Sequence, residues 1–310
     1  MKADLRFNEK TSEFWAYVRV ITQLLRAAKR GEDGINSYEM KAVYEAVKAS
    51  AYPVGALGTP DHPTDLATSL LEYFQYRAQV LNDVVRNDLM TAETAADEFK
   101  KLKDRLGAGE GSPLCDAKNR QTSIKFEVNG VTVNVPMNKQ TGDKRNIQYF
   151  TGMIDLILAD ALGEQFDYDP RTLTALGDEN ELYYTMARRM DGAYPSTINP
   201  KAVWEIKEYY YTTTFGSKIS DAVYITQLDG YELEEIGRQR AVPQLLLMVD
   251  AYEAWWKLGK PYLCRLIDVL NMGKVDEILF GREVLRSLPD IAKTWKDDEL
   301  SLSDQGVETL

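Results

Sequence analysis

The sequence predicts an α/β fold, in which a mixed sheet is flanked by helices and preceded by an all-helical N-terminal domain. Two observations lead to this prediction. The N-terminal third of the 310 residues reads almost wholly as helices, because its apolar residues recur at helical spacing. After a break rich in Gly, Ser and Pro at 106–113, strand-like and helix-like segments follow one another, an order typical of α/β proteins.

Residues 1–108 form the predicted helical domain, in which each helix is marked by an apolar stripe. The stripes consist of Phe14, Val18, Ile21 and Leu25; Met40, Val43 and Val47; Leu66, Leu70, Phe74, Leu81 and Val85; and Phe99, Leu102 and Leu106. Stripes of this kind are far more typical of a packed core than of a functional surface. Recognition of DNA and dimerisation are both open roles for the domain as a whole.

Residues 109–300 form the predicted second domain, which begins with a β-hairpin. Apolar and polar residues alternate on both sides of Asn129-Gly130, the dipeptide favoured in type I′ turns. The elements expected after the hairpin are strands at 149–158, 203–211 and 261–270, two helical pieces within 225–259 interrupted near Pro243, and a helix from Val275 towards Trp295. Residues 301–310 are expected to be a flexible acidic tail.

The strand around Glu205 and Lys207 is the most informative segment for function. Residues two apart in a strand lie on one face, so this carboxylate and this ammonium group are expected side by side. Their neighbours Val203, Trp204 and Ile206 are typical of a sheet interior, where charged groups need compensation. A bound metal ion with a phosphate is one candidate for this compensation, and a structural ion pair between Glu205 and Lys207 is the other.

A second carboxylate, Asp155, lies in the apolar run 149–158 and is the partner expected for Glu205. An Asp on one strand followed by Glu-x-Lys on the adjacent strand resembles the PD-(D/E)XK nuclease superfamily, which includes type II restriction endonucleases. The resemblance implies a restriction-endonuclease-like fold, Mg²⁺ bound by Asp155 and Glu205, and contact of Lys207 with the attacking water or the scissile phosphate. Asp221 is an auxiliary candidate for a metal ligand.

Basic residues near the expected site are candidates for binding DNA. They are Lys139, Lys144 and Arg145, within a locally basic stretch from 116 to 145, and Arg188 and Arg189, in the long insert at about 159–201. The net charge of −11 opposes this reading, because an acidic surface repels a polyanion. A solvated basic loop remains the other interpretation of these residues.

Composition excludes several other classes. A single histidine, His62, leaves no zinc site built on imidazoles, and no phosphate-binding glycine loop or G-x-S-x-G motif occurs. No apolar run reaches membrane-spanning length. Cys115 and Cys264 cannot form a disulfide framework, so a cytoplasmic location is expected.

The expected function is therefore that of a Mg²⁺-dependent endonuclease that hydrolyses double-stranded DNA, in sequence-specific restriction or phage defence. A homodimer is expected, since two strands suit two catalytic centres related by symmetry. Two alternatives stay open. One is a non-catalytic binding or scaffold protein with a structural Glu205/Lys207 pair; the other is a nuclease subunit of a defence complex that acts on another nucleic acid.

Overall fold

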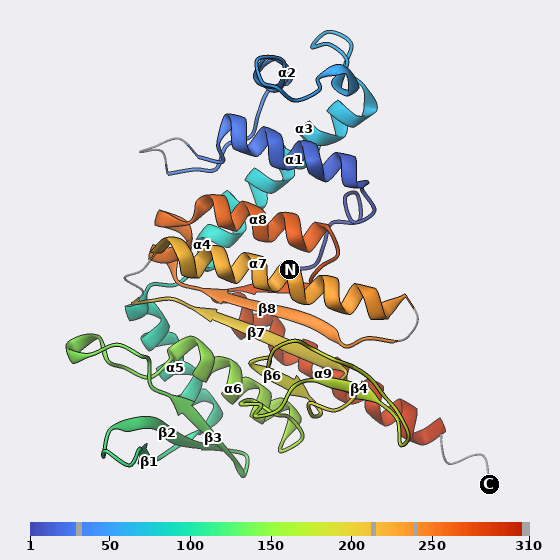
Figure 1. Ribbon diagram of the computed structural model, residues 1–310. Helices are drawn as coiled ribbons and strands as arrows, with labels where there is room; N and C mark the ends of the chain where they lie inside the picture. Colours follow the sequence, from blue (N-terminus) through green and yellow to red (C-terminus); the bar gives the residue numbers. More distant parts are fainter. Residues whose placement is uncertain (29–32, 212–214, 239–240, 306–310) are drawn as a thin grey trace.

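The computed structural model describes residues 1–28, 33–211, 215–238 and 241–305, and shows a mixed α/β protein with a helical N-terminal region and sheets flanked by helices (Figure 1). The helices of the N-terminal part are α1 (Ser12–Leu25), α2 (Met40–Lys48), α3 (Asp65–Gln79), a π-helical segment Val80–Val85, α4 (Arg86–Asp88) and α5 (Ala92–Leu106). Short 3₁₀ turns at Gly55–Leu57 and Gly142–Lys144 complete the loops. The helices predicted in this region are confirmed.

Threonine side chains start three of these helices. Thr11, Thr64 and Thr91 each accept a hydrogen bond from a backbone N–H of the first turn of α1, α3 and α5, respectively. Helices α1 to α3 enclose an aromatic core in which Trp15 and Tyr73 meet edge to face at 5.1 Å between ring centroids. This core makes the N-terminal region a packed unit.

Helix α5 belongs by packing to the second part of the chain. Its Ala95, Phe99 and Leu102 lie in one core cluster with β2, β3 and α6. The sequence places the domain border after residue 108, whereas packing joins the chain to the central sheet from the end of α3, since Ala78, Leu81, Val85 and Leu89 share a core cluster with β8 and α8.

A small antiparallel sheet follows α5, with strands β1 (Gly109–Cys115), β2 (Gln121–Val128) and β3 (Val131–Pro136). Val128 pairs with Val131, and Asn129 and Gly130 between them both have positive φ, at 50° and 84°. These are the backbone angles of a type I′ turn, so the predicted hairpin is confirmed.

The central sheet has the strand order β6-β7-β8-β9. Its strands are β6 (Gly192–Tyr194), β7 (Ala202–Glu208), β8 (Gln244–Asp250) and β9 (Glu277–Phe280). β6 pairs with β7 antiparallel, while β7, β8 and β9 run parallel. A separate two-stranded sheet, β4 (Ala175–Gly177) and β5 (Leu182–Thr185), lies in the insert before β6.

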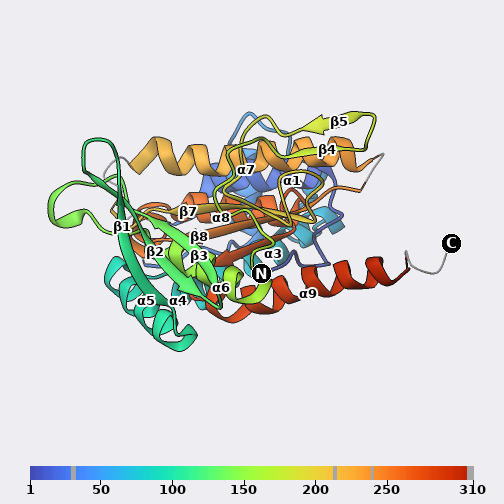
Figure 2. The same ribbon diagram turned by 90° about the horizontal axis from the view of Figure 1, so that it is seen from below.

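Helices cover both faces of the central sheet. Helices α7 (Phe215–Gly237) and α8 (Lys260–Asn271) lie on one face, and α6 (Tyr149–Leu162) and α9 (Glu283–Gln305) lie on the other (Figures 1 and 2). A π-helical segment, Glu253–Leu258, leads from β8 towards α8. The alternation of β7 follows these layers: Val203 packs on the α7 side, and Trp204 on the α6 side.

Several predicted elements after the hairpin are wrong in type. Residues 149–162 and 260–271 are helices rather than strands, and 244–250 and 277–280 are strands rather than helices. In α6, β8 and β9 the apolar run is buried along almost its whole length, so that neither helical nor strand periodicity is visible in the sequence. Helix α8 differs, because Pro261 and Arg265 are exposed and its buried residues follow helical spacing, which the strand prediction did not weigh. The strand around Glu205 and the final helix past Trp295 are confirmed.

The C-terminal segment differs from the expected flexible tail. Helix α9 continues to Gln305, and residues 306–310 lie outside the described part of the chain. Among the described helices, none is long and apolar enough to cross a membrane.

Candidate active site at the edge of the central sheet

Glu205 and Lys207 lie on the face of β7 that α7 covers, and both are almost fully buried, at 6% and 8% exposure. The Lys207 ammonium group donates a hydrogen bond to Glu205 Oε1. A buried carboxylate and a buried ammonium group thus compensate each other directly.

Arg188 extends this pair into a network of four charges. Its Nη1 lies 2.7 Å from Glu205 Oε2, and its Nε and Nη2 donate to the two carboxylate oxygens of Asp229 on α7, at 3.0 and 2.5 Å. Two cations and two anions therefore balance in this network. Arg188, a predicted DNA-binding residue, is engaged by carboxylates rather than free to meet a phosphate.

Asp191 is the carboxylate that the structure brings to Glu205, and sequence reasoning missed it. It stands directly before β6, and its backbone N–H donates to Trp204 O at 3.0 Å while its Oδ2 accepts from Ile206 N at 2.7 Å. Both bonds fix Asp191 on the strand that carries the Glu-x-Lys triplet. The available signal was an Asp-Gly pair opening a short strand one hairpin before Glu205.

The electrostatic surroundings of Asp191 raise the pKa of its carboxyl group to about 6. Limited hydration is the larger cause, because the protein surrounds the group on most sides, although it remains open to solvent within a hollow. The negative charge of Glu205 is the second cause. The bond from Ile206 N and the charges of Lys207 and Arg188 lower the pKa again, so Asp191 shares the electrostatic environment of the charge network.

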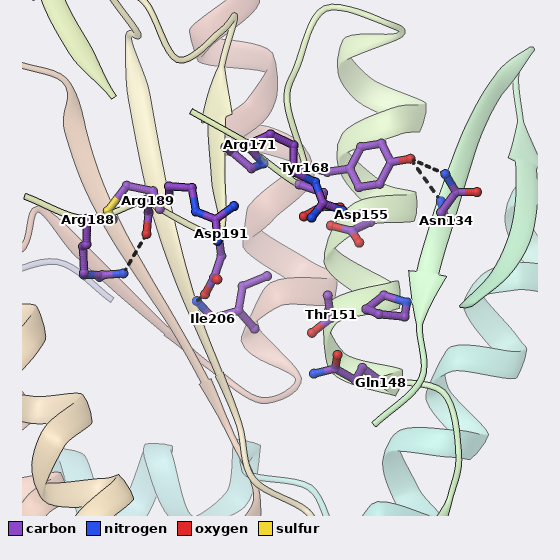
Figure 3. A pocket seen from close by; sticks show the side chains of 14 residues that line it. Asn134, Gln148, Thr151, Asp155, Tyr168, Arg171, Arg188, Arg189, Asp191 and Ile206 are labelled. Atoms are coloured by element: carbon purple, nitrogen blue, oxygen red, sulfur yellow. Dashed lines mark hydrogen bonds and ion pairs between the residues drawn. The ribbon is translucent and has the colours of Figure 1, made fainter. Parts of the chain in front are cut away.

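The hollow next to Asp191 has a volume of about 670 Å³ and lies between α6, the end of β3, the segment 168–171 and the loop 188–191 (Figure 3). Its lining is mostly polar. Asn134 Nδ2 donates to the Tyr168 hydroxyl at 3.1 Å on one side, and Arg189 stands on the other (Figure 3). The volume lies within the range of about 300–1,000 Å³ that is usual for ligand pockets.

Asp155 lines this hollow from α6, on the face of the sheet opposite to Glu205 and Lys207 (Figure 3). The predicted strand position of Asp155 is therefore wrong, and the structure does not bring it to the same face as Glu205. The apolar run around it is a helix buried on all sides, which hides helical periodicity.

The Asp155 carboxyl group is 1% exposed, and among the described residues its Oδ1 has no hydrogen-bond partner. Burial, followed by the charge of Asp191, raises the pKa of Asp155 well above its ordinary value. The hollow thus contains an acid that is costly to ionise.

Asp221 lies exposed on α7 and is not among the described residues that line the hollow. It is nevertheless on the side of the sheet that carries Glu205, since its charge contributes, after burial and after Glu205 and Asp191, to raising the pKa of Tyr209. The structure thus places Asp221 beyond the network rather than within it.

The remaining predicted DNA-binding residues are exposed. Lys139, Lys144 and Arg145 lie in the loop between β3 and α6, where the Arg145 guanidinium donates to the backbone carbonyl of Gln121. Arg189 opens into the hollow beside Asp191. Of these four cations, only Arg189 lines the hollow.

Within the described residues, no group of three or more His, Cys, Asp or Glu side chains is arranged to hold a metal ion. Mg²⁺ does not need such a cage, because it is usually bound by one or two carboxylates together with waters and substrate phosphates. Asp191, directly before β6, and Glu205, on β7, are the two carboxylates that would supply that donor set. A metal ion would have to take the place of Arg188 at Glu205.

Comparison with known proteins gives two matches to family models. Residues 90–295 match a family described as "Domain of unknown function (DUF7687)", and residues 1–84 match another described as "Domain of unknown function (DUF7690)". No curated protein matches the chain, and no solved structure does. The gap between the two matched ranges coincides with α4 and the turn before α5.

Proposed function

We propose that this chain, which belongs to the family described as a domain of unknown function (DUF7687), is a Mg²⁺-dependent endodeoxyribonuclease similar to the PD-(D/E)XK restriction endonucleases. The observation that carries the proposal is the attachment of Asp191 to β7 at Ile206 N, between Glu205 and Lys207. An Asp on one strand and Glu-x-Lys on its antiparallel neighbour is the arrangement that the resemblance implies. Asp191 takes the role that the sequence suggested for Asp155.

Each group has a defined task in phosphodiester hydrolysis. Asp191 and Glu205 would hold Mg²⁺, which supplies an activated water and neutralises charge on the phosphate. Lys207 is a compact positive charge beside this pair and stabilises the charge that develops on the phosphate oxygens. Arg188 leaves Glu205 while it remains bound to Asp229, so α7 keeps the displaced guanidinium close to the site.

Substrate binding rests on Arg189 in the hollow and on exposed cations of the loop between β3 and α6. Arg189 and the loop residues Lys139, Lys144 and Arg145 meet the sugar–phosphate backbone of double-stranded DNA. They offset locally the repulsion that a net charge of −11 creates. A homodimer places one centre on each strand and suits sequence-specific restriction or phage defence.

The test is cleavage of plasmid and phage DNA by the purified chain with Mg²⁺, compared with EDTA. We expect D191N, E205Q and K207M to lower the cleavage rate by at least about 100-fold, the scale of loss when charge stabilisation is removed from a transition state. D160N is the matched control, because Asp160 is an exposed acid on α6 that bonds to Asn129. Cleavage that persists in D191N and E205Q contradicts the proposal.

The charge balance of the network favours one other function. Lys207, Arg188, Glu205 and Asp229 neutralise each other with no metal ion present. A non-catalytic binding or scaffold protein with a structural network would show this feature. This second function predicts no cleavage of any nucleic acid and no heat of Mg²⁺ binding in calorimetry. A nuclease that acts on RNA or single strands would instead cleave one substrate in a panel that includes them.

A further inference from the structure

A second cavity, with a volume of about 480 Å³, lies where the N-terminal region meets the sheet domain. It is bounded by α1 and the residues after it, by α7 and by α8 from Pro261 to Val269. It stands apart from the hollow at Asp191, with which it shares no lining residue. It is thus a separate candidate site, independent of the proposed nuclease function.

Three arginines converge on this cavity: Arg19 on α1, Arg26 directly after α1 and Arg265 on α8. Among the described residues, none of the three guanidinium groups has a carboxylate within ion-pair distance. Unpaired positive charge at this density contrasts with a chain whose net charge is −11. Guanidinium groups are the side chains best suited to bind phosphate.

The acid at the base of the cavity does not neutralise these arginines. Asp268 Oδ1 accepts hydrogen bonds from the Tyr73 hydroxyl at 2.6 Å and from Arg77 Nη1 at 2.9 Å, and its Oδ2 lies 3.2 Å from the same nitrogen. Arg77 is fully buried and therefore already balances the charge of Asp268. The cavity keeps the positive charge of its three exposed arginines.

An aromatic ring adjoins the cationic groups. Tyr224 on α7 is 55% exposed, its hydroxyl accepts a hydrogen bond from Arg265 Nη1 at 2.8 Å, and the Arg265 guanidinium lies 5.7 Å from the centre of its ring. Gln227, one turn further along α7, adds an amide group to the lining. A ring for stacking beside cations for phosphate is the combination that a nucleotide needs.

We propose that this cavity binds a nucleotide, with its phosphates on Arg19, Arg26 and Arg265 and its base against Tyr224. The volume fits a small ligand, because pockets for such molecules span about 300–1,000 Å³. Helices on three sides bound the cavity, which favours a small ligand over a continuous strand of nucleic acid. The site recruits its groups from both parts of the chain, so binding also joins them.

The test is isothermal titration of the full chain with ATP, in the absence of divalent ions, with wild type, R265A, R265K and Y224A. We expect saturable binding of one ATP per chain, weakened about tenfold or more by R265A, less by R265K, and several-fold by Y224A. Arg265 and Tyr224 are exposed, so these variants are expected to fold, and thermal unfolding verifies it. R105A is the matched control, because Arg105 is exposed on α5 and lines neither cavity, while R189A reports whether ATP enters the other hollow instead.

Three outcomes overturn the proposal. One is no heat of ATP binding at about 1 mM, and another is ATP binding that R265A leaves unchanged or that R189A weakens instead. The third is an oligodeoxynucleotide whose binding depends on Arg265 while ATP does not bind, which would assign the arginines to a nucleic acid. Inorganic pyrophosphate, titrated in parallel, is expected to bind more weakly than ATP, because it lacks the ring that Tyr224 contacts.

Discussion

Buried carboxylates have different partners in two regions of this molecule. Where the N-terminal helices meet α8, Asp268 is paired with the fully buried Arg77 and with the Tyr73 hydroxyl. Around α6 and the ends of β7 and β8, Asp155 and Asp250 are buried and Glu208 is half-buried, and none of the three has a cation within ion-pair distance among the described residues. The first arrangement stabilises an ion pair between two helices, while the second contains acids that are costly to ionise.

The acids without cations are held by dipoles instead. Glu208 Oε2 accepts from the backbone N–H and the hydroxyl of Thr151 at the start of α6, both at 3.0 Å. Asp250 Oδ1 accepts from Met90 N and Ala251 N, each at 2.8 Å. These bonds lower the pKa of each group less than burial raises it, so that the pKa of Glu208 is about 7 and that of Asp250 about 8.

The contrast separates buried acids that stabilise a junction through an ion pair from buried acids that have no such partner. A sealed ion pair fixes the position of two elements, and its cost is recovered only while both partners are present. An acid such as Asp155, which faces a hollow with an unpaired oxygen, contributes nothing comparable to packing. The same protein thus contains a paired acid at a helix junction and, in Asp155, a buried acid without a cation.

Removal of Arg77 is the change with the largest expected effect. R77A leaves Asp268 buried without its cation, and we expect the free energy of unfolding in urea to fall by about 3–5 kcal/mol. The control is K101A, because Lys101 forms an exposed pair with Glu98 on α5 and is expected to cost well under about 1 kcal/mol. Equal losses of unfolding free energy in R77A and K101A would show that the buried pair stabilises the fold no more than an exposed one.

Asp250 is expected to make stability depend on pH. Its pKa is about 8 in the folded chain and about 3.9 in an unfolded one, so the folded form binds the proton more tightly. The contribution to stability is therefore complete below about pH 4 and is lost as pH rises towards 8, by at most about 1.4 kcal/mol per pH unit.

D250N tests this dependence, because asparagine keeps an oxygen for Met90 N and Ala251 N. Urea unfolding from pH 5 to 9 is expected to show a shallower loss of stability in D250N than in the wild type. Glu208 contributes a similar loss to both proteins, so the difference between them reports on Asp250. Parallel pH profiles would mean that Asp250 titrates near its ordinary pKa.

The smallest expected effect is a gain in stability, in the variant D155N. D155N removes a carboxyl group whose ionisation is opposed by burial and by Asp191, and we expect the free energy of unfolding at pH 8 to rise by about 1 kcal/mol. The gain should shrink towards pH 4, where Asp155 is already neutral. A loss of stability at pH 8 would show that the unpaired oxygen of Asp155 has a partner in solution and that this carboxylate stabilises the fold.

The predictability of this fold varies with the environment of each segment. The N-terminal helices were predictable because each has a polar face that leaves the apolar stripe visible, and the Asn129-Gly130 turn was predictable from its local chemistry. Helix α8 was predicted as a strand although its apolar residues follow helical spacing, whereas strand β8 was predicted as a helix because it is apolar and buried along almost its whole length. For such runs the identity of the element depends on what packs around it.

The candidate site was predictable in part for the same reason. Glu205 and Lys207 could be placed on one face, because a strand fixes the direction of residues two apart. The first carboxylate could not, because Asp155 and Asp191 both precede the triplet and only the pairing of β6 with β7 decides between them. Arg188 looked available for DNA until the structure placed two carboxylates against it.

By itself the sequence determined what local chemistry controls: the helical N-terminal region, the hairpin, the strand with its Glu-x-Lys triplet and the strong net acidity. The tertiary structure decided everything that depends on which elements become neighbours. It places Asp191 against β7 and Asp155 on the opposite face of the sheet. It also pairs Arg188 with carboxylates and brings Arg19, Arg26 and Arg265 to one cavity. Side-chain direction within an element follows from backbone periodicity, whereas contact between distant segments follows only from how the layers pack.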